Sequence, residues 1–461
     1  MEKIIKSSLK WDDFVFEELS RDAFVAYRKD STFWMTLNNT GYRIFKMISE
    51  GFTAQEIINK LAETYQIPKE YIEHDFNEFV DNMNRKLENA ELIKQKEDEP
   101  SNFKKLPKSM TIHITNKCNL NCPYCYKDAN SNIYELSKDE VIKLIDEAYS
   151  IGFSEFIFSG GEPTLRTDLF EMLEVTKSKY PEIRLNLITN GTTEVADRYI
   201  DVMVKTLNII QISIDSSEEK INSKTRGVGS VEKIKRFCNK LAQRGFKSYY
   251  FACVPYTSGM GDKANIQGVP YLLRFAAYMG AKGLYVNMLK PNGRMSLDEY
   301  QKFNVEEFMK CIDECGKELD NLYNIGYHEL SLFAASDFKH ILVEHKHRAG
   351  CSAGILELAI DNDGKVYPCT SLMIPEFLLG NIRNNSIEEL YDFAYNMFKD
   401  ITVDHMEGCK ECPSRYICGG GCRAIAYMLK NDISAKNPFC EHGKARIELW
   451  QKMSLRIQPK I

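Results

Sequence analysis

Three cysteines at the spacing C-x3-C-x2-C follow directly after an apolar stretch, at Cys118, Cys122 and Cys125. Three thiolates on one tight loop can hold three irons of a four-iron cluster, and the fourth iron then stays open to an outside molecule. An open iron favours catalysis over storage. A structural zinc loop is the alternative, but such a loop normally needs a fourth Cys or His close by, and this one contains none.

The region from Met110 onward alternates short apolar stretches with segments of helix length. One such segment, 137–149, opens with the capping box Ser137-x-x-Glu140. This alternation predicts an α/β fold with a parallel sheet, either doubly wound or a TIM-like barrel, whose active site lies at the carboxyl ends of the strands. Six strands are predicted, at 110–115, 155–159, 184–189, 209–214, 248–254 and 283–288.

A second group of cysteines lies near the C-terminus, where hydrophobic periodicity is weak. Clustered thiols in a long chain with 14 cysteines indicate metal ligands rather than a disulfide framework. A metal-stapled module is therefore predicted there, with two structural zinc sites as the alternative to iron–sulfur clusters. The seven cysteines, spaced around Gly364, are Cys351, Cys369, Cys409, Cys412, Cys418, Cys422 and Cys440.

The first hundred residues form a unit of their own. A strand-like stretch ends at 34–41, a capping box opens a helix at Thr53, and apolar positions over 72–87 form the stripe of a longer helix. Strands followed by helices predict a winged helix. Residues 1–100 contain 14 Lys and Arg against 20 Asp and Glu, and this local charge of -6 disfavours nucleic acid as a partner.

Bulk properties exclude other classes of protein. The formal net charge of -5 gives no basic footprint, and no apolar stretch is long enough to span a bilayer. The first six residues lack the apolar core of a signal peptide. We therefore expect a cytoplasmic protein without a membrane partner. The charged stretch 94–100 is predicted to be a solvated linker, with the domain boundary near residue 105.

The cysteine loop and a second motif together resemble the radical S-adenosylmethionine (SAM) enzymes. The second motif, Ser159-Gly160-Gly161-Glu162-Pro163, follows the second predicted strand and matches the family's GGEP motif. In that family the open iron takes the amino and carboxylate groups of SAM and cleaves it reductively to a 5'-deoxyadenosyl radical. The resemblance implies that the three loop cysteines are both catalytic and metal-binding.

The same resemblance, with polar residues at strand ends, implies a SAM-binding set. Glu162 is expected to accept from the SAM ammonium group, and Arg226 to bind the carboxylate unless it is an ordinary surface arginine. Tyr124 is expected beside the adenine, or else in simple packing. The full set of expected contacts is Tyr124, Gly160, Gly161, Glu162, Asn190, Ser213, Asp215 and Arg226.

The C-terminal array resembles the SPASM domain, which implies two auxiliary [4Fe–4S] clusters and three clusters in the whole chain. Carried over position by position, the second auxiliary cluster uses Cys409, Cys412, Cys418 and Cys440, and the first uses Cys351, Cys369 and Cys422. The first cluster is therefore one ligand short. Its candidate fourth ligands are His345, His347, Cys311, Cys315 or a substrate thiolate, with core packing favoured for the two helical cysteines.

The N-terminal unit resembles the RiPP recognition element of enzymes that modify ribosomally made peptides. The resemblance rests on Leu37-Asn38-x-Thr40-Gly41 and on Gly51-x-Thr53-x-x-Glu56-Ile57-Ile58, each followed by a helix. It implies that the domain binds the leader of a precursor peptide as an added strand. A plain dimerisation or packing domain is the alternative.

These resemblances imply a winged-helix recognition element at 1–100, a partial (β/α)6 TIM-like radical SAM barrel at 106–300, a helical bridge at 301–345 and a SPASM domain at 346–461. An electron donor such as flavodoxin or ferredoxin is a further implied partner.

The expected activity is modification of a precursor peptide by thioether cross-links from a cysteine sulfur to a carbon. The alternatives are carbon–carbon cross-linking or another radical change of the peptide, and a sulfatase-type maturase. Outside enzymology, a cluster-bearing redox sensor would explain the thiols but not the polar set at successive strand ends.

Overall fold

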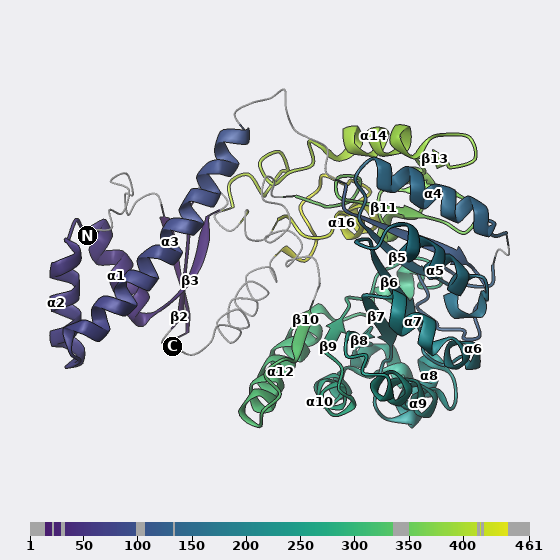
Figure 1. The fold of residues 1–461 in the computed structure, drawn as a ribbon, viewed down its shortest axis with the longest axis horizontal. Helices are drawn as coiled ribbons and strands as arrows, with labels where there is room; N and C mark the ends of the chain where they lie inside the picture. Colours follow the sequence, from purple (N-terminus) through teal and green to yellow (C-terminus); the bar gives the residue numbers. More distant parts are fainter. Residues whose placement is uncertain are drawn as a thin grey trace.

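The computed structural model describes residues 14–20, 23–28, 33–97, 107–131, 134–334, 350–412, 415 and 419–440. An N-terminal unit stands at one end of the molecule and a larger α/β body at the other (Figure 1). Within the described residues, no helix has the length and apolar character needed to cross a membrane.

The N-terminal unit is a three-stranded antiparallel sheet followed by three helices. Strands β1 (Phe14–Ser20), β2 (Ala23–Arg28) and β3 (Trp34–Asn38) pair in that order. Helices α1 (Asn39–Ser49), α2 (Ala54–Tyr65) and α3 (Lys69–Glu97) follow. Sequence explains where two helices begin, because Asn38 Oδ1 accepts from Gly41 N at 2.7 Å and Thr53 forms the predicted capping box with Glu56.

Part of the predicted linker is helical instead. Helix α3 continues through 94–97, while 98–100 lie outside the described residues. The prediction from charge was therefore wrong for 94–97, because Glu, Lys and Gln are also strong helix formers.

The body contains the predicted parallel sheet. Strands β4 to β9 pair in chain order without a reversal, which is the arrangement of a partial barrel and excludes a doubly wound sheet. They are β4 (Ser109–Thr115), β5 (Glu155–Gly160), β6 (Arg184–Thr189), β7 (Ile209–Ser213), β8 (Tyr249–Cys253) and β9 (Gly283–Val286).

Helices between these strands pack on the sheet, as Figure 1 shows for α4, α5 and α7. The described α-helices of the whole body, including those after β9, are α4 (Lys138–Ser150), α5 (Leu169–Lys179), α6 (Glu194–Arg198), α7 (Ile200–Thr206), α8 (Glu219–Arg226), α9 (Ser230–Gln243), α10 (Val269–Met279), α11 (Leu297–Tyr300), α12 (Val305–Asn324), α14 (Ile387–Phe398) and α16 (Arg423–Lys430). The 3-10 turns are Pro163–Leu165, Ser258–Lys263, Ile266–Gly268, Thr370–Leu372 and Pro375–Phe377.

The sheet extends beyond the six predicted strands at both edges. β10 (Ser331–Ala334) adds in parallel to β9, and β11 (Glu357–Ile360) adds in parallel to β4. β12 (Lys365–Tyr367) and β13 (Gly380–Asn381) complete the edge as antiparallel strands. The C-terminal cysteine region is therefore joined by backbone hydrogen bonds to the strand that precedes Cys118, and strand β11 escaped prediction because four residues give no clear periodicity.

Candidate active site

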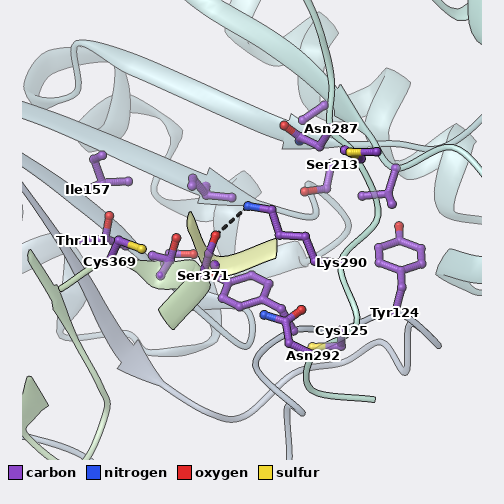
Figure 2. Close-up of a pocket in the computed structure, with 18 of the residues that line it drawn as sticks. Thr111, Tyr124, Cys125, Ile157, Ser213, Asn287, Lys290, Asn292, Cys369 and Ser371 are labelled. Carbon is purple, nitrogen blue, oxygen red and sulfur yellow. Dashed lines mark hydrogen bonds between the residues drawn. The ribbon is translucent and has the colours of Figure 1, made fainter. Parts of the chain in front are cut away.

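A cavity of about 560 Å³ at the centre of the body is lined by both groups of cysteines. Cys118, Cys122 and Cys125 line it from the loop after β4. Cys351, Cys369 and Cys422 line it from the C-terminal region. Figure 2 labels Cys125 and Cys369 among the cavity residues. The fold thus gives two distant cysteine sets one shared space.

The loop after β4 turns its three cysteines toward one cavity, although no three ligating side chains among the described residues are grouped closely enough to hold a single metal ion. Leu120 N lies 3.4 Å from Cys118 Sγ, and Asn130 Oδ1 accepts from Cys118 N at 2.9 Å. Burial is the main cause that raises the pKa of Cys118 to about 12; the charges of Glu162, Cys122 and Cys125 add to this effect, and the hydrogen bond from Leu120 N opposes it. A bound metal ion overcomes that penalty by stabilising the thiolates. The donor set therefore fits an iron–sulfur cluster with three protein ligands.

Residues 287–294, which follow β9 and are called the strap, are hydrogen-bonded to this loop. Arg294 N donates to Cys125 O at 3.0 Å, and Arg294 Nη1 donates to Cys122 O at 3.2 Å. Its Nε bonds Asp128 Oδ1 at 3.0 Å. A Cβ on Gly293, at φ +62°, would overlap with the carbonyl oxygens of Cys125 and Tyr126. Only glycine fits that close backbone approach.

The paired glycines of the GGEP motif also press against the loop. A Cβ on Gly160 would overlap with Thr115 O, and one on Gly161 would overlap with Lys117 O. Gly161 N and Glu162 N donate to the same two carbonyls at 2.8 Å each. Both glycines line the cavity, so one motif fixes the loop and borders the space for a ligand.

Glu162 is fully buried and already surrounded by donors from the protein. Its carboxylate accepts from Thr164 Oγ1 at 2.5 Å, Thr189 Oγ1 at 2.7 Å and Asn190 N at 2.7 Å. Burial raises the pKa of Glu162 above its ordinary value, and these hydrogen bonds offset only part of that increase. Glu162 thus fixes the end of β6, where Asn190 lines the cavity and donates to Asn119 Oδ1 at 2.8 Å.

Arg226, Asp215 and Tyr124 form one network. Arg226 Nε donates to Asp215 Oδ2 at 2.9 Å, and the Tyr124 hydroxyl donates to the same oxygen. The guanidinium carbon of Arg226 lies 5.5 Å from the Tyr124 ring centroid. Tyr124, Arg226 and Ser213 line the cavity, whereas Asp215 is fully buried behind them. Asp215 therefore holds Arg226 in place.

The remaining candidate ligands separate into three groups. Cys409, Cys412 and Cys440 lie in the C-terminal region, and Cys409 belongs to the same small hydrophobic core as Cys369. Cys418, His345 and His347 lie outside the described residues. Cys311 and Cys315 are buried on α12 in the core of the body, where Cys311 Sγ contacts Ile266 O at 3.4 Å. The sequence favoured core packing for Cys311 and Cys315, and both lie in the hydrophobic core.

Sequence reasoning missed the polar residues of the strap. Lys290 Nζ donates to Ser371 Oγ at 2.6 Å, and both residues line the cavity with Asn292. The only signal was a turn-forming run, Pro291-Asn292-Gly293, at the carboxyl end of a predicted strand.

Three family profiles match the chain. They are the Radical SAM superfamily over residues 112–266, coenzyme PQQ synthesis protein D (PqqD) over 24–86 and the SPASM iron-sulfur cluster-binding domain over 351–413. With the fold and the cysteine geometry above, these matches define a radical SAM enzyme that carries a PqqD-like domain and a SPASM domain. SAM and iron–sulfur clusters are the cofactors of that class.

Relatives and solved structures agree with this assignment. AdoMet-dependent heme synthase of Methanosarcina barkeri is 28% identical over 348 residues, 72% of this chain and 96% of that protein. Mycofactocin maturase MftC of Mycolicibacterium smegmatis is 25% identical over 369 residues, 77% of this chain and 87% of that protein.

Among solved structures, SuiB of Streptococcus suis bound to S-adenosylmethionine superposes with a TM-score of 0.59 at 15% identity, over 92% of this chain and 97% of that one. The structure of anSMEcpe with bound AdoMet gives 0.60 at 20% identity, over 76% of this chain and 98% of that one. At these identities the likeness shows the fold.

Proposed function

We propose that this enzyme modifies a ribosomally made precursor peptide, whose leader binds the N-terminal domain while the core peptide enters the central cavity. The observation that carries the proposal is the single cavity lined by both cysteine sets, in a chain that also has a PqqD-like domain. SuiB, whose fold matches 92% of the length of this chain, is also known bound to the precursor peptide SuiA. MftC, a maturase by name, supports the same class of substrate.

Within the described part of the chain, both edges of the N-terminal sheet are free of a further strand and could accept the leader. β1 and β3 each pair only with β2 among the described strands, so each leaves one side without a neighbouring strand. A peptide that adds as a further strand gains backbone hydrogen bonds for affinity and side-chain contacts for selectivity.

We propose three [4Fe–4S] clusters, held by Cys118, Cys122 and Cys125, by Cys351, Cys369 and Cys422, and by Cys409, Cys412, Cys418 and Cys440. When bound with SAM, the first cluster supplies a carbon-based radical that abstracts hydrogen from the substrate. The protein's part is to orient the peptide and to exclude water from the cavity.

We propose a thioether as the product, formed from a cysteine sulfur and a carbon of the peptide. Among the described residues, Cys351, Cys369 and Cys422 of the first auxiliary set border the cavity, and a cysteine thiolate of the substrate suits the fourth ligand position. Cross-link formation would remove a hydrogen atom from the carbon, which leaves in 5'-deoxyadenosine, and a proton from the thiol, while the electron released on ring closure would pass to an auxiliary cluster. An electron donor such as flavodoxin or ferredoxin would supply the reducing electron.

The test is an anaerobic reaction of the reconstituted enzyme with SAM, reductant and a candidate precursor peptide chosen from the neighbouring open reading frames. We expect 5'-deoxyadenosine together with a peptide that has lost two hydrogens and one alkylatable thiol per cross-link. Loss of the hydrogens with all thiols intact would replace the thioether by a carbon–carbon bond. An unchanged peptide would contradict peptide modification altogether.

A second candidate follows from the heme synthase relatives, which match 72% of this chain at 28% identity. The PqqD-like domain favours a peptide over a small substrate, because a small substrate has no leader segment for that domain to bind. Incubation with heme precursors in place of peptide tests this alternative, and formation of heme would support it. A sulfatase-type maturase remains a further alternative, tested by modification of a leaderless peptide.

A further inference from the structure

A fully buried arginine lies next to the C-terminal cysteine set and contacts no acidic side chain in the described part of the chain. Arg423 is the first residue of helix α16 and directly follows Cys422. Its side chain is completely shielded from solvent. We propose that the Arg423 guanidinium is the buried counter-charge of the first auxiliary cluster, and that it raises the reduction potential of that cluster. The inference rests on the ligands proposed above, Cys351, Cys369 and Cys422.

The hydrogen bonds of Arg423 satisfy its donors without neutralising its charge. Nε donates to Gly421 O at 3.2 Å, and Nη2 donates to Gly420 O. Nη1 donates to Ala435 O at 2.7 Å and to Ile433 O at 3.3 Å. All four acceptors are neutral carbonyl groups. A buried charge without an opposite charge carries a large desolvation penalty even when it is hydrogen-bonded, so this site favours a negative group nearby.

Acidic side chains of the same region do not supply that negative group. Asp432 is the acidic residue nearest to Arg423 in the sequence, but it is exposed and accepts from Ser434 N at 2.8 Å. The first turn of α16 contains no acidic residue. A helix N-terminus carries a partial positive charge, which disfavours a cation in the first turn unless an anion lies beside it. A cluster bound by thiolates is such an anion.

The charge of Arg423 reaches the cysteine set. Burial is the main cause that raises the pKa of Cys351 to about 12, and the charges of Cys422 and Glu357 add to this effect. The backbone hydrogen bond of Ala353 and the charge of Arg423 oppose it. The guanidinium therefore lies within electrostatic reach of the sulfur atoms that would hold the first auxiliary cluster.

Other charged side chains also face this cysteine set. Burial is the main cause that raises the pKa of Cys369, the charge of Glu357 adds to it, and the charge of Lys290 opposes it. Both residues belong to the charged side chains that line the cavity in the described part of the chain, which are Lys108, Glu155, Arg226, Lys290, Arg294 and Glu357. Water and salt that enter the cavity weaken the fields of these six groups, whereas Arg423 acts through protein alone.

A buried cation at this place has a direct consequence for electron transfer. One-electron reduction adds a negative charge to an iron–sulfur cluster, and the net charge around a cluster is one of the factors that set its potential. A nearby cation stabilises the reduced form and therefore raises the potential. Arg423 thus favours passage of the electron released on ring closure to the first auxiliary cluster.

The experiment measures the reduction potentials of the clusters in the reconstituted full-length enzyme, by electron paramagnetic resonance during anaerobic titration with dithionite and without peptide. The signal of the first auxiliary cluster is the one that Cys369→Ser removes. Arg423→Gln removes the charge and keeps an amide that can donate to the carbonyls. We expect the equilibrium constant for reduction of this cluster to fall about tenfold, or about 59 mV for one electron.

Two further variants separate charge from structure. Arg423→Lys keeps the charge but loses the planar fork of donors, so it should retain most of the wild-type potential. Lys430→Gln is the matched control, because it removes a positive charge from the exposed end of the same helix. Water and salt screen that charge, so no potential should change. An unchanged potential in Arg423→Gln, equal shifts in the Gln and Lys variants, or a shift confined to the second auxiliary cluster overturns the proposal.

Iron content and thermal denaturation decide the case in which Arg423→Gln does not hold the cluster. Loss of the cluster in Arg423→Gln with retention in Arg423→Lys supports the counter-charge. Loss in both variants overturns it, because the hydrogen bonds to the carbonyls then explain the residue. Absence of this cluster from the wild type overturns the proposed ligands and the inference together. A wild type that shows the expected potentials but leaves the peptide unmodified overturns the proposed peptide modification alone.

Discussion

Individual residues around the cysteine loop act mainly on the backbone. Gly160, Gly161 and Gly293 each stand where a Cβ would overlap with a carbonyl oxygen of β4 or of the loop that follows it. Glu162 uses its carboxylate to fix Thr189 and Asn190. The residues that match SAM contacts of the family therefore also hold the backbone in place. A substitution at one of them is expected to disturb the cysteine loop even when no ligand is bound.

Gly293→Ala tests this at one residue. The new methyl group would overlap with Cys125 O and Tyr126 O, so we expect a loss of stability above about 3 kcal/mol and less iron bound by the loop. Gly245→Ala is the matched control, because Gly245 also has a positive φ, +72°, but has nothing within 4 Å of its Cβ position. It should cost only about 1 kcal/mol.

The measurements are thermal denaturation and iron content after anaerobic reconstitution. Equal losses in the two variants would mean that the φ angle alone matters and that the strap does not press on the cysteine loop.

At the scale of elements, helix α4 shows how one side chain serves both local and long-range structure. Glu140 closes the capping box with Ser137, and its carboxylate also accepts from Arg383 Nε at 2.6 Å. Arg383 follows β13, so this contact joins a barrel helix to the C-terminal hairpin. The hydrogen bond from Arg383, and then the one from Ser137 N, lower the pKa of Glu140 to about 2.

Glu140→Gln should therefore destabilise the protein at neutral pH, by about 1 kcal/mol because the pair is partly exposed. A carboxyl group whose pKa is lowered on folding stabilises the folded state at pH values above its ordinary pKa of 4.5. That contribution is lost as the pH falls toward the folded-state pKa of about 2. The difference between wild type and variant, measured by denaturation across pH, should shrink over this range. A difference that stays constant with pH would contradict the ionic contribution.

At the scale of the whole molecule, the C-terminal region is built onto the barrel as part of one sheet. β11 pairs with β4, and just beyond β11 the carboxylate of Asp361 pairs with Lys127 from the cysteine loop. Lys127 Nζ also donates to Asn362 Oδ1 at 2.8 Å. Burial raises the pKa of Asp361, but the contacts with His113 and Lys127 outweigh it and hold that pKa well below its usual range. The junction thus brings the two cysteine sets to one cavity.

Asp361→Asn should weaken this junction. Removal of one partner from a largely buried ion pair leaves Lys127 without its counter-charge and costs about 3 kcal/mol. We expect lower iron content at both cysteine sets, with slower peptide modification. The double variant Lys127→Met with Asp361→Leu removes both charges, and it should recover much of the stability. If the double variant is destabilised by the sum of the losses measured for Lys127→Met and Asp361→Leu alone, the pair is not coupled.

The sequence alone indicated the class of cofactor and predicted most of the strands of the body. Cysteine spacing is local, so Cys118, Cys122 and Cys125 identify a three-thiolate loop without knowledge of the fold. Alternating apolar stretches likewise predicted the six parallel strands to within a few residues, because each is a buried run between helices. Apolar alternation left the strand order open, the resemblance to radical SAM enzymes implied a partial barrel, and the structure confirmed it by placing consecutive strands side by side.

Only the tertiary structure decided how the parts meet. No local pattern shows that β11 adds to β4, that Cys351, Cys369 and Cys422 border the same cavity as the first cysteine loop, or that Lys290 reaches Ser371. Pairing of this kind depends on contacts between residues far apart in the chain. The candidate ligands are thus indicated by short spacings in the sequence, whereas the shared cavity is set by the packing of two distant segments into one sheet.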